Sequence, residues 1–411
     1  MFEDSTSPEL EKTLSTGSVT LYAGFDPTSD SLQVGNLVTI MTLAHFQLAG
    51  HRPIALAGGA TGMIGDPSGK SAERNLLTHE QAETNLVGIK ENLSRFLDFK
   101  HPTAPAMIVN NNDWFKNYTF IEFLRDIGKH FRMGIMLNKE SVKKRLDSET
   151  GMSFCEFSYQ LLQAYDFLKL YDTEKCVLQI GGSDQWGNIT AGTDLVRRLR
   201  GVEAYGMTHP LVCDSTGAKF GKSAGNAVYL DSRKTSCYAF YQFFMRAEDA
   251  DAVKLLKIYT FLGLDEINAL AESIKTAPEK REAQRRLAEE VTRLVHGETG
   301  LKSAQKASEV LFGGSVEGLK ASEIRDIFAD VPSASLEKSK VEGSAVIDLA
   351  AVSGLCKSKG DARRLVESGG LYVNNRKVDG IQAKVAQADI IEGSVVILRS
   401  GKKSYMIVKV V

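Results

Sequence analysis

The sequence predicts an α/β protein with a doubly wound parallel sheet, followed by an α-helical region and a small α+β module. In the first part of the chain, apolar segments with high strand propensity alternate with amphipathic helical segments, which is typical of strand–helix–strand units. Residues 238–312 have a helical composition with few strand signals. From about residue 345, helical and strand patterns alternate again within a short segment. These three observations predict the fold class.

The first strand is predicted at 19–25, and turn-forming residues follow it at 26–30. A helix is expected over 34–49, because its apolar residues recur on one face and Gly50 is a typical stop. Further strands are expected at 52–59, 107–110 and 176–180, and further helices over 78–97, after Trp186, and over 280–296 up to Gly297. Ligands of such sheets bind at the carboxyl ends of the strands, so the turns after these strands are the expected site.

Composition divides the chain into four segments. Residues 1–235 carry the strand–helix pattern, and residues 236–312 are helical. Residues 313–343 are rich in Ser, Gly and Glu, so we expect a linker there. Residues 344–411 form the C-terminal α+β module.

Charge and cysteine content exclude several classes of protein. The formal net charge is −1, so no global basic field marks a nucleic-acid-binding protein. Residues 345–411, however, carry 11 Lys and Arg against 6 Asp and Glu, an excess of +5 that favours either a local polyanion contact or simply a soluble basic module. The five cysteines form no C-x-x-C pair, which argues against a disulfide framework or a zinc site. No apolar run is long enough to span a membrane and the N-terminus lacks signal-peptide character, so we expect a cytoplasmic protein, or a processed protein of the mitochondrial matrix.

The turn after the first strand carries the first candidate site. Unpaired amides at the start of the helix that follows, together with the helix dipole, favour an anion. Gly35 lets a flat ring or a sugar approach the backbone, and Gln33 and Asn36 supply neutral amide donors. The alternative is an ordinary capped helix.

The second candidate is the glycine-rich segment 58–71. It resembles a phosphate-binding P-loop, but the spacing from Gly65 to Gly69 is one residue short of that motif, and Gly217–Gly221 has the same shortfall, so we reject a P-loop at both places. A loop with Asp66, Lys70 and, further on, Arg74 still indicates a functional site rather than a structural turn.

Polar side chains also gather at two later positions. Tyr159, Gln163 and Asp166 recur at i, i+4 and i+7, so they share one helical face among apolar residues. Asp184 and Gln185 lie where a strand ends and a helix begins. Both patterns indicate the wall of a polar pocket; a solvated helix face and a capping turn are the alternatives.

The segment Lys219-Phe-Gly-Lys222-Ser223 combines two lysines, a glycine and a hydroxyl group. Ammonium groups on a bendable backbone can follow a phosphate as its negative charge grows. We interpret the segment as a loop that grips a polyphosphate, with a solvated surface turn as the alternative.

Together and in this order, these residues closely resemble the tyrosyl-tRNA synthetases of the bacterial and organellar type, over nearly the whole chain. The matching stretches are GFDPTSDSL, GGATGMIGDPSGK, FLRDIGKHF, FSYQLLQAYDF, QIGGSDQWGNIT and KFGKS. The C-terminal module resembles the alpha-L RNA-binding motif. The resemblance implies a Rossmann-like catalytic domain at 1–235, an anticodon-side helical domain at 236–312 and an RNA-binding module at 344–411. It also implies a homodimer that activates L-tyrosine with ATP and charges tRNA(Tyr), with Mg²⁺ bound to the phosphates and no dedicated metal site.

The resemblance also implies roles for individual residues. For the tyrosine substrate they are Tyr22 and Asp166 at the phenol hydroxyl, Asp66, Tyr159 and Gln163 at the ammonium, and Gln185 near the carboxylate. For ATP they are Asp26, Gly35, Asp184 and Lys222. For the phosphates and catalysis they are Thr28, Gln33, Asn36, Lys70, Arg74, Lys219, Lys222 and Ser223. For RNA they are Lys357, Lys359, Arg363, Arg364, Lys402 and Lys403, with Arg197, Arg198 and Arg200 near the acceptor stem.

One departure from the family pattern concerns catalysis. The first signature of the family is usually His-x-Gly-His, whereas this chain has Gln33-Val-Gly-Asn36, and Ala23 stands where many members have a cysteine. Neutral amides can replace neutral imidazoles as donors to phosphate, so we expect an active enzyme. The alternatives are a synthetase-derived RNA-binding or RNA-folding protein with impaired catalysis, and a nucleotidylyltransferase of the same superfamily.

Alanine at Lys219 or Lys222 is expected to reduce tyrosyl-adenylate formation severely while tyrosine binding stays nearly unchanged. The ammonium groups would stabilise phosphate charge that develops in the transition state, not in the tyrosine complex. Single-turnover adenylate formation and equilibrium tyrosine binding measure the two effects, with Lys280→Ala in the helical segment as the control. Equal losses of rate and of tyrosine binding would contradict the assignment.

Overall fold

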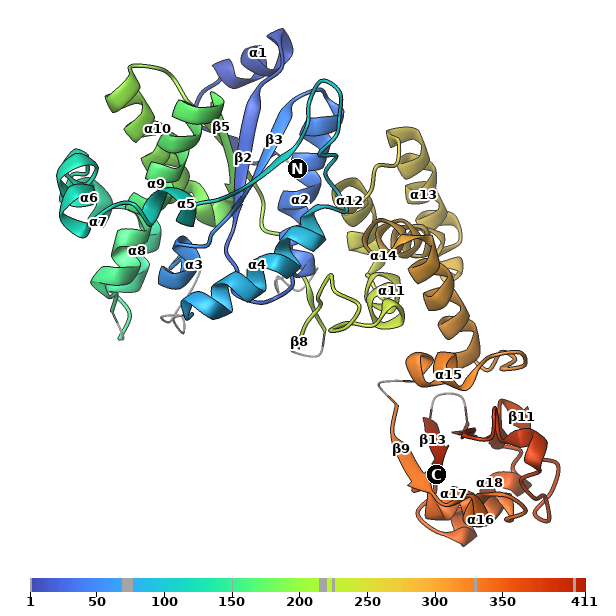
Figure 1. Cartoon of the computed structure of the whole chain (residues 1–411). Coiled ribbons are helices and arrows are strands. Elements are labelled where there is room, and N and C mark those ends of the chain that lie inside the picture. The colour runs from blue at the N-terminus through green and yellow to red at the C-terminus, as the bar shows by residue number, and fades with distance from the viewer. Residues whose placement is uncertain are drawn as a thin grey trace. The chain divides into compact units, whose positions relative to one another are not determined.

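A computed structural model describes residues 2–68, 77–149, 151–213, 220–223, 226–328, 331–401 and 404–411, with no side-chain description at 222, 223, 226 and 326. The chain forms two compact units (Figure 1). The N-terminal unit holds the residues up to Thr235 together with Phe243–Val295, and the C-terminal unit holds Ser236–Gln242 together with His296–Val411. The segment boundaries that the sequence predicted at 235, 312 and 343 remain predictions.

The N-terminal unit is built on a six-stranded sheet with the strand order β1-β6-β5-β2-β3-β4. Its strands are β1 (Asp4–Ser5), β2 (Thr20–Phe25), β3 (Arg52–Ala57), β4 (Met107–Asn110), β5 (Leu178–Gly182) and β6 (Tyr205–His209). Only β1 is antiparallel to its neighbour; the other five strands are parallel. The predicted doubly wound parallel sheet is therefore confirmed.

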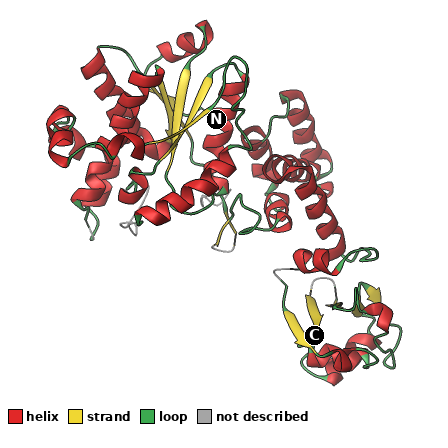
Figure 2. Cartoon of the chain, in the orientation of Figure 1, coloured by secondary structure: helices red, strands yellow, loops and turns green. Residues whose placement is uncertain are grey.

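Helices cover both faces of this sheet (Figure 2). From β2 the chain crosses to β3 on one side through α2 (Val34–Leu48), and from β5 it crosses to β6 on the other side through α10 (Trp186–Arg200). Right-handed crossovers that run in opposite directions place their helices on opposite faces. Next to α10 lies α9 (Phe154–Glu174), whose core residues pack with Tyr22 of β2.

The remaining helices of this unit are mostly short. They are α1 (Glu9–Thr16), α3 (Thr61–Ile64), α4 (His79–Leu93), α5 (Asn112–Phe115), α6 (Phe120–Asp126), α7 (Met133–Leu137), α8 (Glu140–Leu146), α12 (Asp249–Tyr259) and α13 (Leu264–Thr276). Helices α11 (Cys237–Met245) and α14 (Glu282–Leu311) each contribute to both units. Gly297 interrupts α14 with a φ of 71°, which glycine adopts at little cost, so the predicted helix stop at this residue is correct.

The C-terminal unit holds a five-stranded sheet in the order β11-β10-β12-β13-β9. Its elements are α15 (Ala321–Ile327), β9 (Ser333–Leu336), α16 (Lys338–Val341), α17 (Val346–Val352), α18 (Lys359–Glu367), β10 (Leu371–Val373), β11 (Arg376–Lys377), β12 (Val395–Ser400) and β13 (Ser404–Val410). Strand β12 is buried on both faces. Val396 and Leu398 pack with α17 and α18, whereas Val395 and Ile397 pack with α15 and the end of α14.

The expectation of a linker at 313–343 was wrong. This stretch contains α15, β9 and α16, and β9 pairs in parallel with β13 at the register Ile407↔Ser333. Its apolar residues are few but well placed, since Ile324 and Phe328 are buried in the core on one face of the sheet. The amino-acid composition of residues 313–343 therefore did not indicate that they are folded.

The glutamate of a buried ion pair in the N-terminal unit is expected to contribute strongly to stability. Arg145 and Glu156 lie 2.6 Å apart with side chains only 3% and 3% exposed, whereas Lys144 and Glu140, also 2.6 Å apart, are 74% and 82% exposed. Glu156→Ala would remove the carboxylate that faces the buried Arg145 guanidinium, so it should lower the free energy of unfolding by about 3–5 kcal/mol. Glu140→Ala is the matched control and should cost less than about 1 kcal/mol in the same denaturant titration. Equal losses would contradict this difference.

Candidate active site

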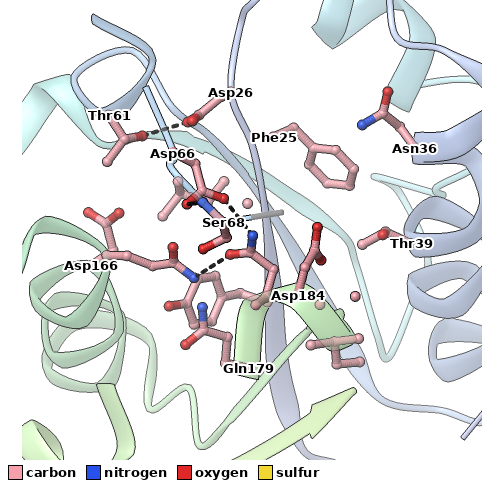
Figure 3. Close-up of a pocket in the computed structure, with 18 of the residues that line it drawn as sticks. Phe25, Asp26, Asn36, Thr39, Thr61, Asp66, Ser68, Asp166, Gln179 and Asp184 are labelled. Atoms are coloured by element: carbon pink, nitrogen blue, oxygen red, sulfur yellow. Dashed lines mark hydrogen bonds between the residues drawn. The ribbon is translucent and has the colours of Figure 1, made fainter. Parts of the chain in front are cut away.

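A cavity of about 280 Å³ lies at the carboxyl ends of β2 and β5 (Figure 3). Strands β3 and β4 lie beyond β2 on one side of the sheet, and β6 lies beyond β5 on the other side. The cavity therefore lies where the strand order reverses, which is the usual ligand site of such sheets. Most of the site residues predicted in the described part of the N-terminal unit line it: Tyr22, Asp26, Thr28, Gly35, Asn36, Asp66, Tyr159, Gln163, Asp166, Asp184 and Gln185.

One side of the cavity presents a hydroxyl group and a carboxylate. Tyr22 is 1% exposed, and its hydroxyl has no hydrogen-bond partner among the described residues. Asp166 accepts hydrogen bonds from Asn111 Nδ2 at 3.1 Å and from Trp114 Nε1 at 2.9 Å. Burial raises the pKa of Asp166 well above its usual range, and burial followed by the charge of Asp166 raises the pKa of Tyr22. The Tyr22 hydroxyl, which has no partner, therefore lies beside the Asp166 acceptor, and this arrangement suits a hydroxyl group of a ligand.

A second carboxylate, Asp66, is surrounded by amides. Gln185 Nε2 donates to Asp66 Oδ2 at 2.5 Å, and the backbone amide of Ser68 donates to Asp66 Oδ1 at 3.0 Å. Gln163 Nε2 in turn donates to Gln185 Oε1 at 3.2 Å. Gln163 of α9 is thus linked to Asp66 through Gln185, and a cationic group can bind at this carboxylate.

The third carboxylate, Asp26, binds the tyrosine of the α9 stripe. Tyr159 donates its hydroxyl proton to Asp26 Oδ2 at 2.8 Å, and Thr61 Oγ1 donates to Asp26 Oδ1 at 2.7 Å. Burial, and then the charge of Asp26, raise the pKa of Tyr159 well above its usual value. The sequence placed Tyr159 with Asp66 and Gln163, whereas in this structure its hydrogen bond goes to Asp26.

The backbone at the start of α2 lies next to the backbone of the segment around Gly221. Val34 N–H donates to the Val228 carbonyl at 2.9 Å, and a Cβ on Gly221 would lie 3.1 Å from the Gly35 nitrogen. The two segments that the sequence singled out as phosphate sites are therefore neighbours. Asn36 Oδ1 caps the helix by accepting from the Gln33 N–H at 3.0 Å, which leaves its amide nitrogen to the cavity that it lines.

Some predicted residues are not placed in the cavity. Gln33 is the N-cap of α2 and does not line the cavity. Lys70, Arg74, Lys219, Lys402 and Lys403 lie outside the described residues, as do the side chains of Lys222 and Ser223.

Sequence reasoning missed several residues of the site. Asn111 bridges Asp166 to Thr61 and accepts from the Ala60 N–H at 2.8 Å, so it fixes two walls at once. Trp114 holds the other Asp166 oxygen. The run Asn110-Asn-Asn-Asp-Trp114 directly after a predicted strand was the available signal. Gln179, Ser68, Thr39 and His209 also line the cavity, and no spacing rule marks them.

The basic candidates lie on exposed helix termini. Lys357, Lys359, Arg363 and Arg364 surround the start of α18, where Lys359 pairs with Asp348 at 3.0 Å. At the end of α10, Arg197 and Arg198 pair with Asp194, and Arg200 pairs with Asp172 at 2.6 Å. Over the described ranges there is no cluster of three or more His, Cys, Asp or Glu that could hold a metal ion. None of the described helices is long and apolar enough to cross a membrane.

Residues 14–313 match the family of class I tRNA synthetases for tryptophan and tyrosine, and the chain belongs to this family. Residues 323–408 match the SYY-like C-terminal domain of tyrosine–tRNA ligases, and this match begins inside the stretch that we expected to be a linker.

Individual relatives narrow the comparison to the tyrosine branch. The tyrosine–tRNA ligase of Opitutus terrae is 52% identical over 98% of this chain and 95% of its own length. That of Geobacillus kaustophilus is 51% identical over 97% and 94%. A C-terminally truncated mitochondrial tyrosyl-tRNA synthetase of Aspergillus nidulans superposes with a TM-score of 0.68 at 31% identity, covering 76% of this chain and 91% of that one.

The hydrogen bond from Trp114 is expected to lower the pKa of Asp166. A donor stabilises the carboxylate relative to the acid, so Trp114→Phe should raise the pKa of Asp166 further. Carboxyl ¹³C NMR titration measures this change, with Asp166→Asn for assignment. Trp186→Phe removes the same indole from the start of α10 and is the control. An unchanged pKa in Trp114→Phe would contradict the role of this bond.

Proposed function

We propose that this protein is a tyrosine–tRNA ligase, which activates L-tyrosine with ATP and transfers the tyrosyl group to the 3′ end of tRNA(Tyr). The observation that carries the proposal is the unpaired, buried Tyr22 hydroxyl beside Asp166 at one side of the cavity. A phenol hydroxyl can donate to Asp166 and accept from Tyr22, whereas phenylalanine would leave the buried Tyr22 hydroxyl without a partner. Such an unmet buried polar group costs about 1–3 kcal/mol.

The rest of the cavity suits the amino-acid backbone of tyrosine. Asp66, Tyr159 and Gln163 would bind the ammonium group, and Gln185 would lie near the carboxylate. In this assignment Asp66 binds both the ammonium group and the side-chain amide of Gln185, whose Nε2 lies 2.5 Å from Asp66 Oδ2. The cation also offsets negative charge from the four aspartates that line the cavity, Asp26, Asp66, Asp166 and Asp184.

The first reaction needs no general base, because the tyrosine carboxylate is ionised above its pKa of about 4 and is itself the nucleophile. One carboxylate oxygen bonds to the α-phosphorus of ATP as the bond to the pyrophosphate oxygen breaks. The protein contributes position and charge stabilisation. In our assignment Asp26, Gly35 and Asp184 hold the nucleoside, while Thr28, Gln33, Asn36, Lys70, Arg74, Lys219, Lys222 and Ser223 hold the phosphates. Mg²⁺ would arrive with the phosphates and neutralise part of their charge.

In the second reaction a terminal ribose hydroxyl of tRNA(Tyr) attacks the tyrosyl carbonyl, and AMP leaves. Phosphate contacts are assigned to Lys357, Lys359, Arg363, Arg364, Lys402 and Lys403 of the C-terminal module. The four described residues are exposed, which supports this assignment.

The active form is proposed to be a homodimer that works in the cytoplasm. Exposed apolar side chains on α6 and α7 support a subunit interface: Phe120, Ile121, Leu124, Met133, Ile135 and Leu137. Relatives from bacteria at about 50% identity support the compartment. The same relatives do not favour an RNA-folding protein or a nucleotidylyltransferase.

Tyrosine-dependent ATP–pyrophosphate exchange tests the proposal. Exchange should be robust with tyrosine and absent with phenylalanine. Tyr22→Phe should raise the KM for tyrosine about 2- to 13-fold, the equivalent of one hydrogen bond of about 0.5–1.5 kcal/mol. Tyr205→Phe, which removes a hydroxyl on β6 bonded to Thr13, is the control.

Exchange by Gln33→His/Asn36→His, compared with the unaltered chain, measures the catalytic cost of the two amides. No tyrosine-dependent exchange in either protein, together with tight RNA binding, would overturn the proposed activity in favour of the impaired RNA-binding protein.

A further inference from the structure

A second cavity of the N-terminal unit has a volume of about 340 Å³ and lies between α10 and the segment that leads from α6 to α8. Its wall combines apolar side chains, among them Phe131, Met136 and Leu195, with several basic ones. None of the residues that line it lines the first cavity. The proposed activity therefore assigns no ligand to this second cavity.

Lys139, between α7 and α8, is a half-buried side chain whose amine is held at the wall of this cavity. Its Nζ donates a hydrogen bond to the carbonyl oxygen of Gly187 in α10. Its aliphatic stem packs on the same residue, because a Cβ built on Gly187 would lie 3.4 Å from Lys139 Cδ. The amine is therefore fixed beside the cavity rather than free to move in solvent.

The charged groups around Lys139 leave its amine without an anionic partner. Asp194 is the acidic residue of the cavity wall, but its two oxygens pair with Arg197 at 2.8 Å and with Arg198 at 2.7 Å. Over the described ranges no carboxylate forms an ion pair with Lys139. The remaining titratable or charged residues of the wall are basic: His130 and Arg132.

These surroundings make Lys139 a stronger nucleophile at neutral pH than an exposed lysine. Burial lowers the pKa of Lys139 to about 8, and the charge of Asp194 opposes this shift. About 10% of the amine is then neutral at pH 7, against about 0.04% for a lysine with an ordinary pKa of about 10.4. A neutral amine that donates one N–H keeps its lone pair for attack on an electrophile.

We propose that Lys139 is an acylation site for small acyl phosphates, whose phosphate group the basic side chains of this cavity bind. Arg132 forms no ion pair with the described carboxylates, so its guanidinium can hold the phosphate. The Lys139 nitrogen attacks the acyl carbon, the bond from this carbon to the phosphate oxygen breaks, and inorganic phosphate leaves with the electron pair. The amine proton passes to solvent. The amide product keeps one N–H, which can still donate to the Gly187 carbonyl.

Acetyl phosphate is the probe, and mass spectrometry of peptides measures acetylation of the intact protein. At pH 7 Lys139 should react about 10-fold faster, or more, than Lys144, an exposed lysine of α8 that pairs with Glu140. Ile135 also lines the cavity and belongs to the proposed subunit interface, so the protein is kept in its native assembly. Lys139→Arg should remove the fast phase of acetylation.

The dependence of the rate on pH separates a nucleophilic amine from a merely accessible one. The rate at Lys139 should rise as the amine loses its proton and level off above about pH 8, because the neutral form is then complete. A lysine in an unstructured peptide should keep gaining rate toward about pH 10. A profile at Lys139 that matches the peptide, or equal rates at Lys139 and Lys144, would overturn the proposal.

Arg132→Gln tests whether the cavity binds the phosphate group. The rate at Lys139 should saturate with acetyl phosphate, fall when inorganic phosphate is added, and fall about 2- to 5-fold in Arg132→Gln, as expected for loss of one exposed charge contact. Acetic anhydride carries no phosphate and should acetylate Lys139 equally fast in both proteins. A rate that rises linearly with acetyl phosphate and ignores Arg132→Gln would refute the phosphate site.

This inference is independent of the proposed activity, because the reaction uses neither tyrosine nor ATP. A chain without tyrosine-dependent exchange would refute the activity and leave the acetylation rates as they are. Slow acetylation of Lys139 in a chain with robust exchange would refute the acylation site alone.

Discussion

The site depends on the short pairing between strands β2 and β5. Strands β2 and β3 stay in register over six residue pairs, from Thr20↔Arg52 to Phe25↔Ala57. Strands β2 and β5 pair only at Leu21↔Leu178 and Tyr22↔Gln179. Beyond these pairs the two strands separate, and the backbone that leaves them delivers polar side chains into the gap. A longer ladder at this point would close the cavity, so the short pairing is the constraint on which the whole site is built.

Carboxylates dominate this gap, and their surroundings keep them in place. Asp26, Asp66 and Asp166 each accept at least two hydrogen bonds from neutral donors. Neutral donors hold an acid in position without cancelling its charge. The charge of Asp26 adds to burial in raising the pKa of Asp166. A cationic ligand would relieve the repulsion between Asp26 and Asp166, so these carboxylates favour a ligand that carries positive charge.

The sequence predicted the elements whose structure depends on residues close together in the chain. Apolar runs located β2, β3 and β4, and the helical period of the α9 stripe correctly placed Tyr159, Gln163 and Asp166 on one wall. The sequence did not predict β6, β9 or β13, nor that residues 313–343 are folded. Strand β9 is short, and its partner β13 lies far away in the chain. Asn111, Trp114 and His209 were missed for the same reason: each acts through a tertiary contact that no spacing rule encodes. The roles of individual residues remain predictions.

The parallel pairing of β9 with β13 has a consequence for how the chain folds during synthesis. Every strand of the N-terminal sheet lies within the first 209 residues, so that sheet can assemble while later residues are still being added. In the C-terminal sheet, Ser333 must wait for Ile407. Closing so long a loop is entropically costly before its contacts form. Strand β9 and the apolar side chains around it therefore stay without this partner until β13 has been added, which leaves them open to aggregation during that interval.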